Sequence, residues 1–277
     1  MSAFGATVVG DGGTLLDVDA AHVERQLADH GYVLLRGLRD AIDRFDSFTD
    51  QFGRARPANL RVGSPRRFAG DRGSQYVTPG TGPVPLHAES YFTPLCPDVV
   101  AFGCVEAGAD GGHTLLCDGR ALLASLPAED RAILERTSIL WEYRATVAEL
   151  ESQTRAPLAD TVNICRRQQS CTVAVRDAIV EIRYSAPAIR RTRFPGAPAL
   201  ANSLIPIKEA GGLGSACPGL PEEVVTRVAA HAERMTVQHR WSEGDIVLVD
   251  NSRVMHGRTA IEAGTRRILV RMVAVEA

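Results

Sequence analysis

The hydrophobic pattern near the N-terminus predicts two helices that flank one buried strand. A helix from Asp19 to about His30 has Val23 and Leu27 on one face, with a capping side chain at its start and a glycine at its end. The apolar run YVLLRG that follows directly predicts a buried strand. Apolar residues then recur at helical spacing over 40–52, which predicts a second helix.

Short apolar segments dominate the rest of the chain, and turn residues separate them. This pattern is typical of a β-sandwich or barrel. One amphipathic helix interrupts it, where Pro221 suits a first helical turn and Val224, Val228 and Met235 share a face. The chain is therefore expected to be mainly β with flanking helices, built on a jelly-roll core. The expected strands are about 98–104, 138–143, 170–176 and 179–184, followed by TVQHR, DIVLV, RVMHG and RRILVRMVAV.

The domain organisation follows from composition along the chain. No linker-like change divides the 277 residues, so a single domain over 1–277 is predicted. Segment 53–86 is rich in Gly, Pro, Ser and Arg and has no periodicity. A long irregular segment inside a compact domain is typical of a functional lid or of a disordered stretch.

Charge and cysteine content exclude several classes of protein. The net charge of -2 gives no electrostatic footprint for nucleic acid or an anionic membrane. No apolar run approaches the ~20 residues of a membrane helix, and the first residues do not resemble a signal peptide. Six cysteines without CxxC pairing indicate reduced thiols in the cytoplasm, with a structural disulfide as the less favoured alternative. The oligomeric state is not indicated.

Histidine and acidic residues two positions apart occur three times, as HVE at 22–24, HAE at 87–89 and HAE at 231–233. Seven histidines and 33 acidic residues in 277 positions give about one such pair by chance, so the spacing alone is weak evidence. Side chains at i and i+2 point apart on a helix but share a face on a strand. The first and third pairs lie in predicted helices, whereas the second follows two prolines in an extended setting. Only His87 and Glu89 can therefore chelate one ion.

A third ligand is expected at His256, which follows a strand that ends in the turn signal Asp250-Asn251. A jelly-roll can bring distant strands together at its mouth. Two histidines and one carboxylate on one face of an octahedron are the arrangement of non-haem Fe(II) oxygenases. The alternative for each residue taken alone is an ordinary polar side chain.

Arginines in the last predicted strand extend this site. Strand alternation puts Arg267 and Arg271 on one face, with Arg266 on the other face beside Ile268 and Val270. An arginine that faces the inside of a barrel is costly unless it has an anionic partner. A carboxylate held by the guanidinium group is the natural partner.

Four segments together resemble the Fe(II)/2-oxoglutarate-dependent dioxygenases of the taurine dioxygenase superfamily. Within it, the chain is most similar to the clavaminate synthase and carbapenem synthase type, and the similarity covers nearly the whole chain. The family is known for a double-stranded β-helix, the jelly-roll expected above. The segments are HGYVLLRGL, PLHAESYF, AGADGGHTLLCDGRALLASLP and WSEGDIVLVDNSRVMHGR with RRILVR; the last is specific because Trp241, Gly244, Asp245, Asp250, Asn251, His256 and the arginines fall in register.

The resemblance implies a role for each matching residue. His87, Glu89 and His256 would bind Fe(II), while Arg267 and the hydroxyl of Thr114 would hold the far carboxylate of the cosubstrate 2-oxoglutarate. Glutamate as the third ligand fits members that act on amino acids, and it argues against a halogenase.

The resemblance is less informative about substrate contacts. Arg271 occupies a second family arginine position that serves the substrate in some members, with a structural ion pair as the equal alternative. Tyr91 and Phe92 either contact the substrate or pack in the core. Segment 53–86 would be an active-site lid, and segment 186–220, which matches no family motif, is expected to shape the substrate pocket.

The implied function is an oxygenase that uses Fe(II), 2-oxoglutarate and O2. It would hydroxylate a C–H bond of a small amino acid or amino-acid-derived metabolite, free or carrier-bound, in specialised metabolism such as antibiotic biosynthesis, with release of succinate and CO2. Desaturation, ring closure or epimerisation on the same scaffold are alternatives. A non-catalytic barrel that binds a metal or a small acid, or a zinc hydrolase, belongs to a different class. The sequence does not indicate the substrate or its stereochemistry.

Overall fold

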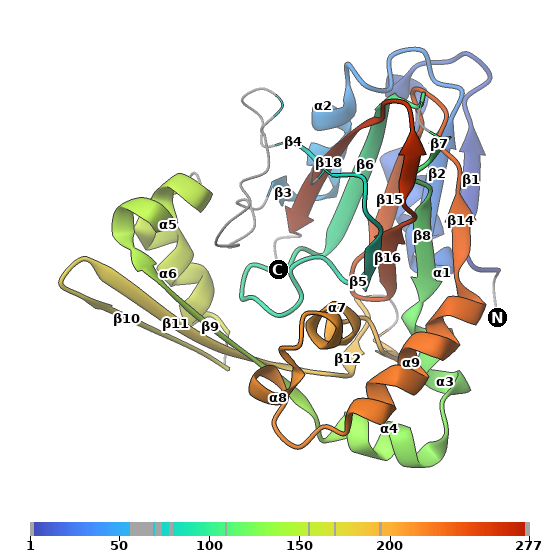
Figure 1. Ribbon diagram of the computed structural model, residues 1–277. Coiled ribbons are helices and arrows are strands. Elements are labelled where there is room, and N and C mark those ends of the chain that lie inside the picture. Colours follow the sequence, from blue (N-terminus) through green and yellow to red (C-terminus); the bar gives the residue numbers. More distant parts are fainter. Residues whose placement is uncertain are drawn as a thin grey trace.

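Two antiparallel-rich β-sheets form the centre of the computed structural model (Figure 1). The larger has the strand order β1-β2-β15-β6-β18-β3, with β4 also beside β18, and the smaller has the order β14-β8-β16-β5. Their bounds are β1 Ala6–Val9, β2 Tyr32–Arg36, β3 Arg54–Ala55, β4 Gln75–Tyr76, β5 Val84–His87, β6 Val99–Glu106, β8 Thr114–Asp118, β14 Val237–His239, β15 Ile246–Asp250, β16 Val254–Arg258 and β18 Arg267–Ala274. The structure describes residues 3–55, 69, 74–77, 80–108, 110–154, 156–168, 170–193 and 196–274.

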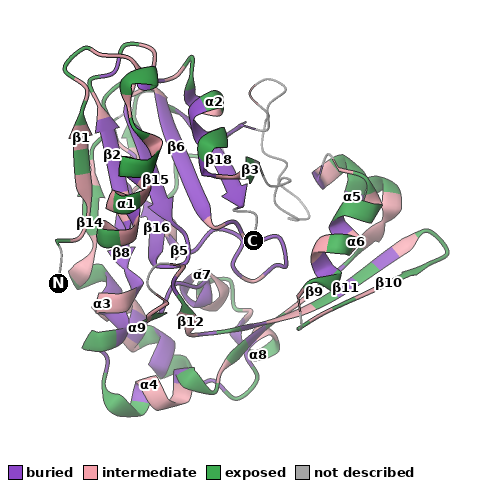
Figure 2. Cartoon of the chain, turned by 180° about the vertical axis from the view of Figure 1, so that it is seen from behind, coloured by how far each residue is buried: buried purple, intermediate pink, exposed green. Residues whose placement is uncertain are grey.

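Apolar side chains of both sheets meet between them, as expected of a double-stranded β-helix. Val100 and Phe102 of β6, Leu116 of β8 and Val254 of β16 belong to one buried cluster. The other face of the larger sheet packs against helices near the N-terminus. Figure 2 shows the larger sheet as largely buried behind these helices. The predicted mainly-β jelly-roll with flanking helices is therefore confirmed.

The first predicted helix forms as α1 (Ala20–His30), and the chemistry at its ends explains its limits. The Asp19 carboxylate accepts a hydrogen bond from the backbone N–H of Ala21, and Gly31 ends the helix with a φ of 83°. The second predicted helix is shorter than 40–52. It consists of α2 (Phe45–Thr49) and the 3₁₀ turn η2 (Asp50–Phe52), and the Asp40 carboxylate before it accepts the N–H of Leu15 in the 3₁₀ turn η1 (Leu15–Asp17).

Three of the predicted strand regions lie outside the jelly-roll. β9 (Ser138–Thr146), β10 (Cys171–Arg176) and β11 (Ile179–Pro187) form a separate three-stranded sheet in the order β10-β11-β9. It projects from the two central sheets as an arm and carries α5 (Val147–Thr154) and α6 (Leu158–Arg166) on one face (Figure 1). The strands form as predicted, but they do not contribute to the barrel.

The remaining helices pack beside the smaller sheet around one buried cluster. The long helix α9 (Glu222–Met235) matches the predicted amphipathic helix, with Pro221 as its N-cap and Val224 and Val228 buried. The described part of segment 186–220 contains the end of β11, two short helices and a small strand pair. The other elements are η1 Leu15–Asp17, β7 Asp110–Gly111, α3 Gly119–Ser125, α4 Ala128–Glu135, β12 Arg190–Arg191, β13 Pro198–Ala199, α7 Leu204–Glu209, α8 Leu213–Ala216 and β17 Ile261–Ala263.

Most of the predicted lid cannot be compared with the structure. Within 53–86, residues 56–68, 70–73, 78 and 79 lie outside the described residues, and five arginines of this segment are among them. The lid therefore remains a prediction, and so does the single domain.

All six cysteines are free thiols, and no described helix is long and apolar enough to cross a membrane.

Candidate metal centre and adjoining cavity

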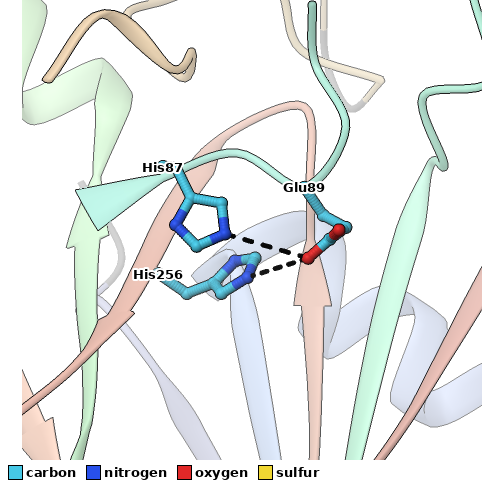
Figure 3. A group of neighbouring side chains, drawn as sticks. All are labelled: His87, Glu89 and His256. Carbon is cyan, nitrogen blue, oxygen red and sulfur yellow. Dashed lines mark ion pairs between the residues drawn. The ribbon is translucent and has the colours of Figure 1, made fainter. Parts of the chain in front are cut away.

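The three predicted ligands converge at one point in the structure. Nε2 of His87 lies 3.8 Å from Oε2 of Glu89, and Nε2 of His256 lies 3.6 Å from the same oxygen. Figure 3 shows the three side chains directed toward one another. One donor atom from each residue lies within 4.8 Å of the other two, and no other such cluster of His, Cys, Asp or Glu occurs among the described residues.

Strand pairing brings the two histidines together across 169 positions of sequence. His87 ends β5, and its direct partner on the neighbouring strand β16 is His256. The two imidazole rings lie 4.5 Å apart, between ring centroids. Nδ1 of His87 lies 2.8 Å from the carbonyl oxygen of Pro85. A proton on Nδ1 donated to that carbonyl leaves the lone pair of Nε2 for a metal ion.

A glycine between the two strands permits this close approach. Gly257 follows His256, and a Cβ atom at this position would lie 2.6 Å from the carbonyl oxygen of Val84 in β5. Real Cβ atoms do not approach a backbone oxygen so closely. Any other residue at 257 would therefore push β5 and β16 apart.

Glu89 is positioned through its backbone by a distant asparagine. The N–H of Glu89 donates to Oδ1 of Asn251 at 2.7 Å, and Nδ2 of Asn251 donates to the carbonyl oxygen of Glu89 at 3.0 Å. The same Nδ2 donates to the carbonyl of Pro97 at 2.9 Å. Ser90, directly after Glu89, has a φ of 52°, a backbone conformation rare for a non-glycine residue. The amide group thus holds a tight turn that directs the carboxylate toward the histidines.

The donor set fits a ferrous ion. Two imidazole nitrogens and one carboxylate oxygen match the facial arrangement of non-haem iron sites, with Glu89 and His256 buried and His87 partly exposed. The N···O separations of 3.6 and 3.8 Å are too long for hydrogen bonds, as is expected of donors that share a metal ion. The other two His-x-Glu pairs lie in α1 and α9, as the sequence predicts.

A cavity of about 290 Å³ adjoins the three ligands. Its wall is mostly apolar, and polar groups gather at the metal centre and at one further place. The described lining residues are Val77, Pro83, Val84, Pro85, His87, Glu89, Phe92, Phe102, Thr114, Ser203, Pro206, His256, Gly257, Arg258, Arg266 and Val270. Cavities of this kind, apolar with a few convergent polar groups, are typical of small-molecule sites.

Two arginines and a threonine form a basic end of this cavity. Arg258 lies opposite Thr114 on the neighbouring strand β8, and its Nη2 donates to the carbonyls of Gly80 and Gly82 at 2.8 and 2.6 Å. Burial, together with the charge of Arg258, lowers the pKa of Arg266 to about 10. An arginine with this pKa is still charged at neutral pH, so the end of the cavity carries positive charge.

Arg266 has unused hydrogen-bonding capacity. Its Nη1 donates to the carbonyl of Gly112, but its buried Nε has no hydrogen-bond partner among the described residues. A buried guanidinium nitrogen without an acceptor is costly. A carboxylate in the cavity would satisfy it, which identifies this end as a candidate anion site.

The structure does not bring Arg267 into the cavity. Its side chain is 58% exposed, and its Nε lies 3.1 Å from the Glu106 carboxylate on the outside of the larger sheet. Arg267 has the neighbouring position and the opposite face from Arg266. The role that the resemblance implies for Arg267 therefore fits the position of Arg266 better.

Arg271 is also directed away from the cavity. Its side chain is 3% exposed and forms ion pairs with Asp46 in α2 and Asp50 in η2. Of the two alternatives for this residue, the structure places it in the structural ion pair.

The two aromatic residues predicted as substrate contacts lie in different places. Tyr91 is buried; its hydroxyl donates to the carbonyl of Pro187, and the guanidinium of Arg190 lies 4.7 Å from the centre of its ring. Phe92 lines the cavity. Thr114, expected near the cosubstrate, also lines it.

Sequence reasoning missed four lining residues of interest. Arg266 was recognisable, since alternation puts it on the same face as Ile268 and Val270. Arg258 lies two residues after a predicted ligand on the same strand face. Ser203 and Pro206 lie in segment 186–220, which was expected to shape the pocket, but no pattern in the sequence singled out these two residues.

The chain matches a protein family over almost its full length. The family described as "Taurine catabolism dioxygenase TauD, TfdA family" matches residues 1–273.

Two curated relatives are similar over about two thirds of the chain. One is a 3-((Z)-2-isocyanoethenyl)-1H-indole synthase from Fischerella ambigua, 23% identical over 201 residues that cover 69% of this chain and 63% of the relative. The other is a tyrosine isonitrile desaturase from Pseudomonas aeruginosa, 24% identical over 191 residues that cover 68% and 58%. The chain thus matches only about six tenths of the length of these relatives.

A solved structure gives a match over the whole fold. The structure of PvcB, described as an Fe, alpha-ketoglutarate dependent oxygenase from an isonitrile synthetic pathway, has a TM-score of 0.62 and 20% sequence identity. The superposition covers 99% of this chain and 86% of that protein. At this level of identity the similarity shows a shared fold.

Proposed function

The chain belongs to the taurine catabolism dioxygenase TauD, TfdA family, and on this premise we propose that it oxidises a C–H bond of a small amino-acid-derived metabolite. It is an oxidoreductase of the dioxygenase type whose cofactors are Fe(II) and 2-oxoglutarate, with O2 as the oxidant. The observation that carries the proposal is the convergence of His87, Glu89 and His256 beside a cavity with a basic end. The resemblance seen in the sequence is confirmed at the level of this family.

The three ligands would hold Fe(II). When bound, the iron and 2-oxoglutarate supply the oxidising chemistry, while the protein supplies orientation and excludes water. The protonated Nδ1 of His87 fixes the imidazole for metal binding through the Pro85 carbonyl, and Asn251 fixes the backbone of Glu89. Phe102 packs edge-on against the ring of His256, with 5.2 Å between ring centroids.

The basic end would hold the far carboxylate of 2-oxoglutarate. Arg258 and Thr114 are direct strand neighbours, and Arg258 lies two residues beyond His256. Two residues along a strand span roughly 7 Å, a length that a five-carbon diacid can bridge from the iron. Arg266 would contribute its guanidinium and Thr114 its hydroxyl, because a carboxylate held by a guanidinium is a strong, directional pair. We therefore propose Arg266, rather than Arg267, as the arginine that holds this carboxylate.

The remaining wall supports a substrate without a free ammonium group. Phe92, Pro85, Ser203 and Pro206 present apolar and hydroxyl surface. Glu89 is the one acid among the described lining residues, and it would be engaged with the metal. A free amino acid needs a partner for its positive nitrogen, since a buried unpaired charge is costly. An amino-acid derivative whose nitrogen is neutral fits this wall better, and both curated relatives carry isonitrile chemistry in their names.

The outcome of the oxidation has two candidates. Hydroxylation is the outcome implied by the resemblance in the sequence. Desaturation is the second, and the name of the tyrosine isonitrile desaturase favours it. Product mass separates them, because hydroxylation adds one oxygen atom and desaturation removes two hydrogen atoms. Ring closure also removes two hydrogens, so a double-bond signal in the product's NMR spectrum is needed as well.

The test of the proposal has two stages. Under anaerobic conditions, Fe(II) and 2-oxoglutarate together should give a weak visible absorption band that neither gives alone, and folded protein without this band would refute the proposal. Amino-acid-derived metabolites are then screened for succinate release that needs Fe(II) and O2. Zn(II) in place of Fe(II) should give no succinate; substrate hydrolysis with Zn(II) would instead support the hydrolase alternative. We also propose the cytoplasm as the compartment, in keeping with six free thiols.

A further inference from the structure

We propose that Trp241 is a positioning residue that fixes the Thr114 hydroxyl as a hydrogen-bond donor toward an anion in the cavity. The proposal rests on the proposed function, because the anion concerned is the far carboxylate of 2-oxoglutarate. It adds a residue that does not line the cavity to those that determine how tightly the cosubstrate is held.

The contact that carries the inference joins the two residues directly. Nε1 of Trp241 donates to Oγ1 of Thr114 at 3.0 Å. Thr114 is 4% exposed and lines the cavity, whereas Trp241 stands behind it and packs against the cluster between the two sheets. The indole therefore touches the cavity wall from its protein side.

The chemistry of the two groups makes this contact directional. An indole N–H can only donate, while a threonine hydroxyl has one hydrogen and two lone pairs. Once the indole occupies a lone pair, the hydroxyl hydrogen must point elsewhere, and the cavity is where an acceptor would bind. Without the indole the hydroxyl is free to turn. The pair thus favours a carboxylate over a ligand that presents a donor.

The indole is itself held by a partly buried polar chain. The ring of His239 meets that of Trp241 edge-on, with centroids 4.5 Å apart and planes at 87°. Nε2 of His239 lies 3.3 Å from the carboxylate of Asp245, which accepts two hydrogen bonds from Arg36 at 2.7 and 2.6 Å. These supports allow the indole little movement.

Strand pairing adds a second constraint. His239 in β14 is the direct partner of Thr114 in β8, and Arg258 in β16 is its partner on the other side. The hydroxyl is thus fixed between a strand that leads to Trp241 and a strand that carries a cavity arginine. The arrangement couples the basic end of the cavity to the polar chain behind it.

The first experiment measures cosubstrate affinity without turnover. 2-Oxoglutarate is titrated calorimetrically into protein loaded with Mn(II), in the absence of O2 and substrate. Trp241→Phe keeps the ring but removes the donor, and it should weaken binding about 3- to 10-fold, the worth of one modest hydrogen bond. The chain has two tryptophans, so Trp141→Phe in the arm is the matched control and should leave the affinity unchanged.

A double-mutant cycle shows whether the indole acts through the hydroxyl. Thr114→Val removes the hydroxyl, and Trp241→Phe should then have no additional effect. Thr114→Ser retains the hydroxyl and should restore the sensitivity to Trp241→Phe. A purely structural role of the indole would weaken binding in all three backgrounds, and that result would overturn the proposal.

A measurement on the unaltered side chains covers the case in which the variants fold poorly. Protein labelled with ¹⁵N-tryptophan and loaded with diamagnetic Zn(II) should give two indole N–H signals, assigned with Trp141→Phe. Addition of 2-oxoglutarate should shift the Trp241 signal and leave the other in place. Equal or absent shifts on saturation would contradict the inference.

The proposed function and the role of Trp241 are refuted by different results. If the metal-loaded wild-type protein does not bind 2-oxoglutarate, both the proposed function and this inference are wrong. If it binds and Trp241→Phe binds equally well, only the role of Trp241 is wrong.

Discussion

Asn251 binds both backbone groups of Glu89, although the two residues are 162 positions apart in the sequence. One amide side chain accepts from the N–H at 2.7 Å and donates to the carbonyl at 3.0 Å. Asn251 follows β15 directly, in the turn that leads into β16 and His256. The position of the carboxylate therefore depends on the same turn that delivers the second histidine.

Replacing Asn251 should weaken metal binding more than it affects the fold. Asn251→Ala removes both contacts to Glu89, so the carboxylate loses its fixed direction, and outer contacts of this kind are typically worth 10- to 100-fold in metal affinity. Metal affinity is measured by competition with a chelator. Asn163→Ala, an exposed position on α6, is the control. Equal affinities of the two variants would contradict the proposed positioning.

His256→Ala should abolish cosubstrate-dependent oxidation while the protein remains folded. The side chain provides one of three donors, and two donors do not hold the metal in place. Succinate release and the circular dichroism spectrum are the measurements. His22→Ala is the matched control, because His22 also belongs to a His-x-Glu pair but lies exposed on α1. Full activity in His256→Ala would contradict the metal centre.

Arg266 and its neighbour Arg267 offer a direct test of which arginine holds the cosubstrate. Arg266→Ala should raise the 2-oxoglutarate requirement roughly 30- to 150-fold, since hydrogen bonds to charged groups contribute about 2–3 kcal/mol. Arg267→Ala removes an exposed ion pair with Glu106 and should change it less than twofold. The apparent KM for 2-oxoglutarate is compared in both variants. A larger effect of Arg267→Ala than of Arg266→Ala would show that Arg267 holds the cosubstrate.

Arg271 should matter for stability. Arg271→Ala leaves Asp46 and Asp50 without this partner. It also leaves a cavity where the Arg271 side chain, which is 3% exposed, was packed. Both acids are partly exposed, so we expect a loss of about 1–3 kcal/mol in the free energy of unfolding. Urea denaturation measures it. Arg183→Ala, whose ion pair with Glu142 is exposed, should change it by less than about 0.5 kcal/mol. Similar losses in both variants would argue against a buried ion pair.

Stability should fall in acid through Asp245. Burial raises its pKa, but hydrogen bonds from Arg36 and the Ser242 N–H, with the His239 imidazole 3.3 Å away, outweigh burial and lower it to about 2. A carboxyl group with a depressed pKa stabilises the fold above its unfolded value of 3.8 and loses this contribution as the pH falls toward 2. The contribution is about 2 kcal/mol at neutral pH. Asp245→Asn should flatten the pH dependence of the unfolding free energy between pH 4 and 2, and an unchanged slope would contradict this source.

The fold was predictable where local chemistry agrees with the hydrophobic pattern. α1 has a capping aspartate, an apolar face and a terminal glycine, and α9 has an N-terminal proline and a valine face. The arm was not predictable as a separate sheet, because β9, β10 and β11 alternate as barrel strands do. Their separate packing depends on α5 and α6, whose pattern is too weak to identify in the sequence.

The candidate metal centre and its cavity were also predictable only in part. The converging position of the three ligands follows from their type, their strand setting and the family resemblance. The choice among the arginines does not, because one residue along a strand reverses the face. Alternation put Arg266 and Arg267 on opposite faces without indicating which face is inward, whereas the family spacing pointed to Arg267. The partners of Arg271 come from a helix more than 200 positions away, which no local pattern reveals.

Because Gly257 has no side chain, one part of the cavity wall is formed by closely packed backbone that substitutions cannot alter. Other parts of the wall are formed by side chains that can be replaced. β5 and β16 touch backbone to backbone there, so the separation of the two imidazoles is set by peptide groups rather than by replaceable side chains. The side chains of Phe92, Ser203 and Pro206, from loops and a short helix, form another part of the cavity wall. Substitutions that retune which molecule is oxidised should therefore accumulate on that wall, while position 257 tolerates none.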